Sequence, residues 1–403
     1  MSRVLVLSRH SGPLDRRIIA EINTLAASGR EVTLVSTAAV LPEACLDTNV
    51  RVVMPAPSRS GSVEWLKHAT HKLPPRLRAL VRAAWYRFGQ GPVPCTVRYF
   101  LQMTPPEMFD VIHCHDLDTL PAAVALRDMY CPGATLIYDA HELFPFQFQD
   151  RTWQRYWSEV EAEHITAADL VITVNESVAK ELVQQYHIPQ PTVIYNSYGV
   201  PSRREAIDEK TFLEHFGAHA GGFRVMFQGQ FVREKNLEQL VMAFQWLRDS
   251  TQLFLLGDGP IETSLKKLCR RLGLANVFFG PWVPQQDLLA YVSHADLGII
   301  PYSGSTLLNN RYCTPNKLFE FIEADVPICA SDLPELRRFV KDNGIGDVYV
   351  MEDPAAIARA IEACRCRCVQ GGLTTPALQV ARDKYAWTWQ GKKLMQLYET
   401  MGV

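Results

Sequence analysis

Short apolar runs alternate with longer stretches of helical periodicity along most of the chain, in two successive series. The first series has runs at 4–7, 31–36, 110–115, 134–139, 169–174 and 192–196; the second, after the polar stretch PSRREAIDEK, has runs at 223–229, 252–259, 276–280, 295–301, 326–330 and 347–351. Apolar residues three and four positions apart fill most of the gaps, as in LEQLVMAFQWL. Strands that alternate with helices form parallel sheets. The pattern therefore predicts an α/β protein with two doubly wound, Rossmann-like domains.

The length of 403 residues fits two domains of ordinary size. We place the first domain at 1–198, with a helix in 385–403 that crosses back onto it, and the second domain at 199–384. Doubly wound domains bind ligands at the carboxyl ends of their strands. Two such domains face to face are expected to form a cleft, and we expect the site there.

Composition excludes several classes of protein. Hydrophobic residues make up 47% and charged residues 21%, as in globular proteins, and the net charge of −2 argues against nucleic-acid binding. No apolar run approaches the length of a membrane span, and the apolar run within MSRVLVLSRHSG is too short for a signal peptide. We therefore expect a cytoplasmic protein whose ten cysteines are reduced thiols. CRCRC at 364–368 lacks the usual zinc-site spacing and lies at a predicted helix end.

Glycines follow several of the predicted strands. Gly12 lies after the first strand, in SRHSGPLD, and Gly229 ends the strand at 223–229, in FQGQFVREKN. We expect both glycines at the donor-binding site. Lys235 follows Gly229 by six positions, immediately before a predicted helix, and could reach a diphosphate at the helix N-terminus. An ordinary solvated lysine is the alternative. The GDG sequence places Gly257 and Gly259 where the backbone can approach a ligand closely.

The stretch TPNKLFEFIEA lies between two predicted strands and opens a helix with Asn316 and Lys317 in its first turn. Free N–H groups at a helix start favour an anion. Glu320 follows one turn later and would repel a diphosphate, but its carboxylate could accept hydrogen bonds from a ribose diol. The pattern therefore predicts phosphate at the helix N-terminus and ribose at Glu320.

Several segments in the second half of the sequence resemble a known family. FQGQFVREKNLEQLVMAF, LFLLGDGPIETSLKKL, FFGPWVP and ADLGIIPYSGSTLLNNRYCTPNKLFEFIEADVPICASDLPELRRFV look like the nucleotide-binding domain of family 4 glycosyltransferases of the GT-B fold. They are most similar to the bacterial branch with a PNKLFEY-like segment. The first half resembles the family more loosely, through HDLDTLP, YDAHELFP and LDRRIIAEINTLAASGREV.

The resemblance implies retaining glycosyl transfer from a nucleotide sugar without a cofactor or an essential metal. It implies that Lys235 holds the donor diphosphate. It also implies that Glu320, as the second glutamate of an E-x7-E signature, binds the ribose. Two positions depart from the family. Gln230 replaces an arginine that often follows the glycine of the first motif, and Tyr312 replaces the first glutamate of E-x7-E. The PNK turn could substitute for that glutamate, with Lys317 near the phosphates.

Two further strand ends carry polar side chains. VIHCHDLDTLP provides His113 and His115, and YDAHELFP provides Asp139, His141 and Glu142. By resemblance, His115 lies near the donor sugar. His141 and Glu142 could orient or deprotonate an acceptor hydroxyl. The alternatives are a core histidine and a structural hydrogen-bond cluster.

The segment 59–98 is strongly basic, with eight lysines and arginines and the single acidic residue Glu64. Within it, PRLRALVRAAWYRF has an apolar helical face. This combination suggests a surface that binds anionic lipid or an anionic acceptor. A helix that packs its apolar face on its own domain is the alternative.

Together these features predict a hexosyltransferase-type enzyme that moves a sugar from a UDP- or GDP-sugar to a glycan or lipid-linked glycan. We expect it in bacterial polysaccharide biosynthesis, either in the cytoplasm or peripheral on the inner face of the membrane. One alternative is a nucleotide-sugar epimerase of the same fold. The other is a catalytically silent partner subunit, which the departures at Gln230 and Tyr312 favour.

Overall fold

The structure is a computed structural model that describes residues 2–9, 14–37, 46–54, 92–199, 206–247, 251–303, 307–373 and 375–403. Two sequence predictions lie outside these residues. One is the glycine turn at Gly12, and the other is most of the basic segment, from 59 to 91. Arg98 is described, because it lies on the first helix after that gap.

The first domain is built on a seven-stranded parallel sheet. Its strands are β1 (Arg3–Ser8), β2 (Glu31–Ser36), β3 (Arg51–Val53), β4 (Val111–His115), β5 (Thr135–Ala140), β6 (Leu170–Thr173) and β7 (Thr192–Val193). They lie in the order β3-β2-β1-β4-β5-β6-β7, so the strand order reverses between β1 and β4. All six strands predicted in this half are present. The seventh, β3, was missed because three residues are too few to show a pattern.

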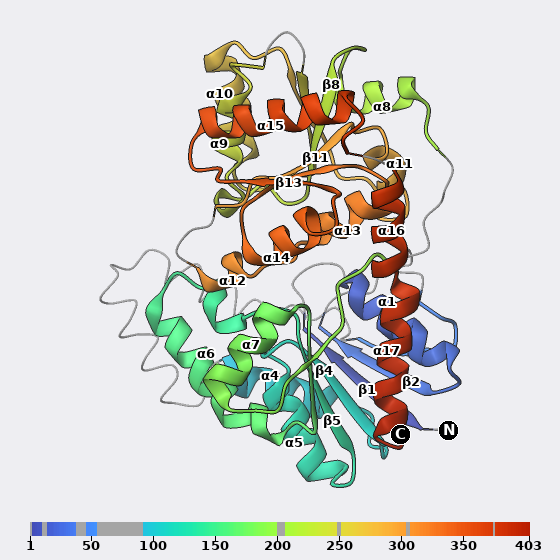
Figure 1. Cartoon of the computed structure of the whole chain (residues 1–403). Coiled ribbons are helices and arrows are strands. Elements are labelled where there is room, and N and C mark those ends of the chain that lie inside the picture. Colours follow the sequence, from blue (N-terminus) through green and yellow to red (C-terminus); the bar gives the residue numbers. More distant parts are fainter. Residues whose placement is uncertain are drawn as a thin grey trace.

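Helices cover both faces of this sheet (Figure 1). Alternate side chains of β1 point to opposite faces: Val4 and Val6 pack with α1, whereas Leu5 and Leu7 pack on the other face. The helical elements are α1 (Arg16–Ala27), α4 (Pro92–Met103), α5 (Leu120–Tyr130), η2 (Phe144–Gln147), α6 (Arg151–His164), η3 (Ile165–Ala167) and α7 (Glu176–Tyr186). Because both faces are buried, the strands read as nearly continuous apolar runs.

The second domain has a six-stranded parallel sheet in the order β10-β9-β8-β11-β12-β13. Its strands are β8 (Phe223–Gln228), β9 (Thr251–Leu256), β10 (Val277–Gly280), β11 (Leu297–Ile300), β12 (Ile328–Ser331) and β13 (Gly346–Tyr349). All six were predicted. The order reverses between β8 and β11, which places the expected ligand position at the ends of these two strands.

The helical elements of the second domain are α8 (Glu209–Phe216), η4 (Arg233–Lys235), α9 (Leu237–Ala243), α10 (Glu262–Leu272), α11 (Leu288–Val292), α12 (Leu308–Arg311), α13 (Asn316–Glu323), α14 (Pro334–Leu336), η5 (Arg337–Lys341), α15 (Pro354–Val369) and α16 (Thr375–Tyr385). The helix predicted at the PNK turn is α13, with Pro315 as its N-cap. The CRCRC run forms the end of α15, where Cys364 is buried and Cys366 is exposed.

The last helix, α17 (Trp387–Thr400), lies on the first domain, and Figure 1 shows it following α16 down from the second domain. Leu394 and Tyr398 are fully buried in the core that also contains Ile18. The Trp387 indole N–H donates to Thr24 Oγ1 on α1 at 3.0 Å. The end of the chain is therefore part of the first domain's structure.

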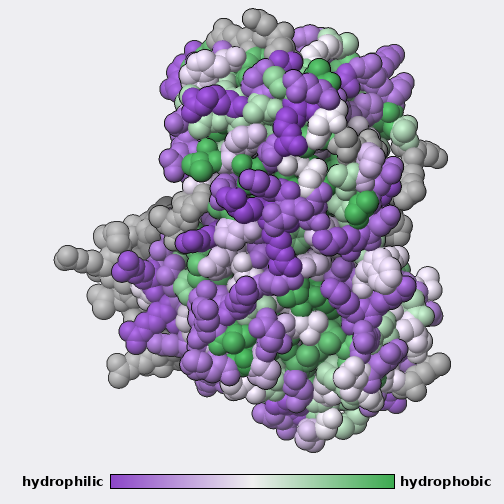
Figure 2. All heavy atoms as spheres, viewed as in Figure 1, coloured by the Kyte–Doolittle hydropathy of each residue, from purple (hydrophilic) through white to green (hydrophobic). Residues whose placement is uncertain are grey.

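Polar side chains predominate on the face shown in Figure 2, with apolar side chains scattered among them. Within the described residues, no helix is both long enough and apolar enough to cross a membrane. Two open surface hollows lie along α8 and between α1 and α17. Neither is lined by the polar residues predicted at the strand ends, so the candidate site is identified from the residues themselves.

Candidate active site at the domain interface

Two glycine loops meet at the carboxyl ends of β8 and β9. Gly229 and Gly257 have φ angles of 128° and 137°, which side-chain-bearing residues rarely adopt. A Cβ on Gly257 would lie 2.3 Å from the carbonyl oxygen of Gly229. Gly259 is in the same loop, next to Phe231, whose N–H donates to the Asp258 carbonyl at 2.6 Å. The predicted glycines therefore form one surface of closely packed backbone.

Two lysines converge on Tyr302 beside this surface. Lys317 Nζ donates to the Tyr302 hydroxyl at 2.5 Å, and Lys235 Nζ lies 3.9 Å from the Tyr302 ring centroid. A Cβ added to Gly229 would be 3.2 Å from Lys317 Nζ. The predicted residues Lys235, Lys317 and Gly229 thus lie together, whereas Gln230 is exposed.

The lysine cluster has the electrostatics of an anion site. Burial and, second, the positive charge of Lys235 together lower the pKa of Lys317 to about 7. Burial also lowers the pKa of Lys235. A bound anion would supply the negative charge that two adjacent lysines favour, and the N-terminus of α13 adds to this preference.

Glu320 and Asn316 are bound to the first domain. Arg16 donates to Glu320 Oε1 at 2.6 Å and to the carbonyl of Asn316 at 2.9 Å. Gln228 donates to Glu320 Oε2 at 3.1 Å, and the Asn196 amide donates to Asn316 Oδ1. Both carboxylate oxygens of Glu320 therefore already accept a hydrogen bond. A ribose at Glu320 has to displace one of these donors or use the remaining lone pairs, and the ribose role stays a prediction.

Across the interface, three side chains meet at the ends of β4 and β5. His115 Nδ1 lies 3.0 Å from His141 Nε2, and Asp139 Oδ2 lies 3.5 Å and 3.4 Å from these two atoms. His115 is buried, and the His141 side chain is 12% exposed. The three side chains, which were predicted at two different strand ends, are thus in contact.

The two histidines carry different charges. Burial lowers the pKa of His115 to about 4, although its hydrogen bond to Asp139 raises it. Burial would also lower the pKa of His141, but the carboxylates of Asp116 and Asp139 outweigh it and raise this pKa to about 10. His115 is therefore neutral and His141 is an imidazolium at neutral pH.

Asp116 adopts a φ of 65°, an uncommon backbone conformation for a non-glycine residue.

Glu142 connects this cluster to the second domain. Asn309 on α12 donates from Nδ2 to Glu142 Oε2 at 2.6 Å, and Asn309 Oδ1 accepts from the Leu143 N–H at 3.1 Å. Burial raises the pKa of Glu142, while Asn309, His141 and Lys235 lower it. Glu142 thus lies close enough to the lysine cluster for the two charges to interact.

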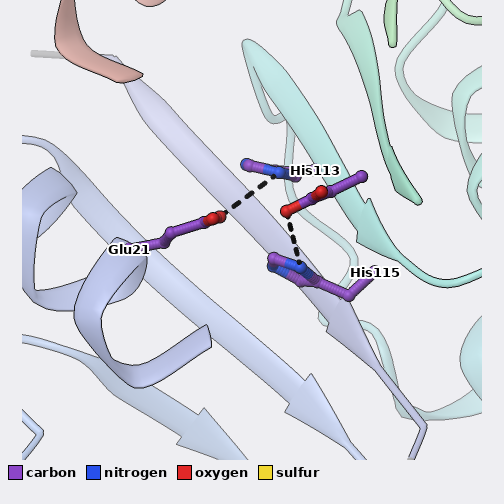
Figure 3. Close-up of side chains that lie close together, drawn as sticks. Glu21, His113 and His115 are labelled. Carbon is purple, nitrogen blue, oxygen red and sulfur yellow. Dashed lines mark ion pairs between the residues drawn. The ribbon is translucent and has the colours of Figure 1, made fainter. Parts of the chain in front are cut away.

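A second polar cluster lies deeper, between α1 and the sheet. Arg17 donates to both oxygens of Asp139, at 2.8 and 2.9 Å, and to Glu21 at 2.8 Å. His113 lies 2.9 Å from the Tyr398 hydroxyl and 3.7 Å from Glu21 Oε2. Figure 3 shows Glu21 directed at His113, with His115 beside them. His113 is therefore a core histidine, which was the alternative interpretation.

The ligating atoms of Glu21, His113, His115 and Asp139 lie within 4.8 Å of one another, close enough to hold a metal ion. The Arg17 guanidinium pairs with both carboxyl groups of this set. Burial raises the pKa of Glu21 to about 8, so the one remaining negative charge, on Asp139, is already neutralised by Arg17. A divalent cation beside it would face an uncompensated positive charge. The residues therefore fit a structural ion-pair network better than a metal centre.

Sequence reasoning missed the side chains that join the domains. Hydrogen bonds from one domain to the other are formed by Arg16, Asn175, Asn196 and Asn309. The only local signals were the paired arginines in LDRR and the asparagines in TVNES, YNSYG and LLNNR, and these are common in loops and helix caps. Gly12 lies outside the described residues, so its role in donor binding stays a prediction.

Both halves of the chain match glycosyltransferase family models. Residues 16–198 match the model described as Glycosyltransferase Family 4, and residues 222–365 match Glycosyl transferases group 1. The chain belongs to the glycosyltransferases of the GT-B fold.

Related sequences agree with this assignment. The glycosyltransferase is 25% identical to EpsD of Bacillus subtilis (strain 168), a protein named as a glycosyltransferase, over 63% of this chain and 67% of EpsD. It is 32% identical to the phosphatidyl-myo-inositol mannosyltransferase of Mycobacterium leprae over 22% of this chain and 26% of that protein.

Solved structures agree on the fold. Sucrose-phosphate synthase from Thermosynechococcus elongatus has a TM-score of 0.70 at 17% identity, covering 100% of this chain and 99% of that one. Anabaena HepE in complex with UDP-glucose has a TM-score of 0.70 at 15% identity, covering 99% and 100%. At these identities the likeness concerns the fold alone.

The opposite charge states of the two histidines are open to a direct test. We expect His141 to remain protonated at about pH 8 and His115 to remain neutral, because their pKa values are displaced in opposite directions from the ordinary histidine value of about 6.5. Nitrogen-15 spectra of labelled histidine rings measure both, with assignments from His141→Gln and His115→Gln. The charge on His141 stabilises the fold fully below the unfolded pKa, and this stability is lost as pH rises towards about 10. Titration of His141 near pH 6.5 would contradict this assignment.

Proposed function

We propose that this glycosyltransferase moves a hexose from a nucleotide sugar to an acceptor hydroxyl with retention of configuration at the anomeric carbon. One observation carries the proposal: Lys235 and Lys317 converge beside Gly229 and the start of α13. Two cations at a helix N-terminus suit a diphosphate leaving group, whose charge increases as its bond to the sugar breaks.

The donor would lie between the two domains, at the points where the strand order of each sheet reverses. Its diphosphate would bind the lysines and the N-terminal N–H groups of α13, and its ribose would take hydrogen bonds at Glu320 by displacing Arg16 or Gln228. The solved structures of HepE contain UDP and UDP-glucose. That fact supports UDP as the nucleotide for this chain, and GDP is the alternative that the sequence left open.

The sugar would lie towards the first domain. His115 would contact the sugar being transferred, and His141 and Glu142 would face the acceptor. In the reaction the bond from the anomeric carbon to the phosphate oxygen breaks with its electron pair on the leaving diphosphate. The acceptor oxygen bonds to the same carbon, and its proton passes to Glu142 or to the leaving phosphate. In this scheme the lysines carry the charge stabilisation, so no metal is required.

The acceptor is proposed to be a bacterial glycan or a lipid-linked glycan at the cytoplasmic face of a membrane. Two relatives support this. One is the mannosyltransferase described above, whose name includes phosphatidyl-myo-inositol. The other is TuaH of Bacillus subtilis, named for teichuronic acid biosynthesis and 26% identical over 56% of its length. The basic segment 59–98 would provide peripheral attachment.

The reaction itself is tested with isotopically labelled UDP- and GDP-sugars and a panel of glycan and glycolipid acceptors. We expect transfer from one donor, a product with the donor's anomeric configuration by NMR, and a rate unchanged by EDTA. Inversion or a strict metal requirement would contradict the mechanism. Donor epimerised in the absence of acceptor would favour the epimerase, and binding without turnover would favour the silent subunit.

Donor binding is tested by calorimetry with the nucleoside diphosphate. Lys235→Ala and Glu320→Ala should each weaken binding by about 1.5 to 3 kcal/mol, the range for hydrogen bonds to charged groups. Lys210→Ala is the matched control, since the Lys210 side chain is 79% exposed on α8. Unchanged affinity in both site variants, with the fold intact, would remove these residues from the donor site.

Membrane attachment is tested by sedimentation with vesicles. The protein should sediment with anionic vesicles and be released by salt, because each lysine or arginine near an anionic surface contributes about 1 kcal/mol. Replacing Arg76, Arg78, Arg82 and Arg87 with Ser should abolish sedimentation and leave nucleotide binding intact. Wild-type protein that ignores anionic vesicles at low salt would refute the membrane role.

A further inference from the structure

The short helix α12 belongs to the second domain but packs against η2 of the first. Its residue Asn309 makes two hydrogen bonds to consecutive residues there. The Nδ2 amide donates to Glu142 Oε2, and Oδ1 accepts from the Leu143 backbone N–H. The amide can adopt only this orientation, because exchanging Oδ1 and Nδ2 would set oxygen against the carboxylate and N–H against N–H.

We propose that Asn309 is a positioning residue that holds the Glu142 carboxyl for the acceptor hydroxyl, and that it does so across the domain interface. The inference rests on the proposed function, because it assigns Asn309 a part in the acceptor chemistry of that same site.

The hydrogen bond from Asn309 affects the charge state of the Glu142 carboxyl group. Glu142 is drawn towards its neutral form by burial and towards its charged form by three groups: Asn309, His141 and Lys235. Only a charged carboxylate accepts a proton from an acceptor hydroxyl. Within the described residues Asn309 occupies Oε2, and no hydrogen bond to Oε1 is present. Asn309 therefore favours the reactive charge state and leaves one oxygen for the acceptor.

The position of Asn309 is itself set by the interface. At the other end of the same segment, the Asn175 amide donates to the Tyr312 carbonyl at 2.8 Å and to Thr314 Oγ1 at 3.3 Å. Asn175 Oδ1 also caps α7 by accepting from the Val178 N–H. The segment 308–314 is therefore attached to the first domain at both ends. Asn309 reaches Glu142 only while the two domains are in contact there.

The experiment compares Asn309→Ala and Asn309→Asp with Asn310→Ala and Asn310→Asp. Asn310 is the neighbouring asparagine on the same helix and takes no part in the bond to Glu142. The first readout needs no activity: carbon-13 titration of labelled glutamate carboxyls, with Glu142 assigned from Glu142→Gln. Both Asn309 variants should raise the pKa of Glu142, and Asn309→Asp should raise it more because it adds a negative charge.

The second readout is the pH profile of transfer. We expect kcat to fall about ten- to hundredfold in Asn309→Ala, the fold-change that matches loss of a hydrogen bond to a charged group. Nucleoside diphosphate affinity should stay within about twofold of the wild type. In Asn309→Asp the acidic limb of the kcat profile should shift to higher pH, which a purely structural role would not produce.

Asn309 variants that match the Asn310 variants in the Glu142 titration and in kcat would overturn the inference. Equal losses of donor affinity and kcat in Asn309→Ala would also overturn it, because they would assign Asn309 to general integrity of the site. A wild-type protein without transferase activity would refute the proposed function instead, and the carboxyl titration would still decide the role of Asn309.

Discussion

The buried pair of Arg17 and Asp139 is the interaction on which the first half of the site depends. Both side chains are completely buried, and the guanidinium also donates to Glu21 and to the Ile194 carbonyl at 2.6 Å. It therefore joins α1, β5 and the segment after β7. A buried arginine or carboxylate left without its partner typically costs about 3 to 5 kcal/mol. Asp139 is at the same time the shared partner of His115 and His141, so this pair fixes where both histidines lie.

The neighbouring arginine directs the same helix end towards the other domain. Arg16 binds Glu320 and Asn316, which are 304 and 300 residues away along the chain. Two consecutive positions of α1 thus hold the acceptor-side strand ends and the donor-side helix in one arrangement. Glu320 is predicted to bind ribose, so donor binding and the Arg16 contact involve the same carboxylate. A change of partner at Glu320 would couple donor binding to the position of the first domain.

Sequence patterns identified what is local and failed where distant segments meet. The twelve predicted strands are present because apolar runs and helical periodicity are properties of short windows. Parallel topology then placed His115 and His141 at strand ends, and Lys235 and Lys317 near the starts of the helices α9 and α13. The contacts of Arg16 with Glu320 and of Asn309 with Glu142 could not be predicted, because no periodicity relates residues in different domains. β3 was missed because it has only three residues.

We propose that the nucleoside diphosphate binds between the glycine loops and α13. A crystal structure of the protein with UDP, or with GDP if UDP does not bind, tests it most directly. We expect phosphate oxygens within hydrogen-bond distance of Lys235 or Lys317 Nζ and of the first N–H groups of α13, with the ribose near Glu320. A nucleotide bound elsewhere, such as along α8 or between α1 and α17, with neither lysine in contact, would contradict it.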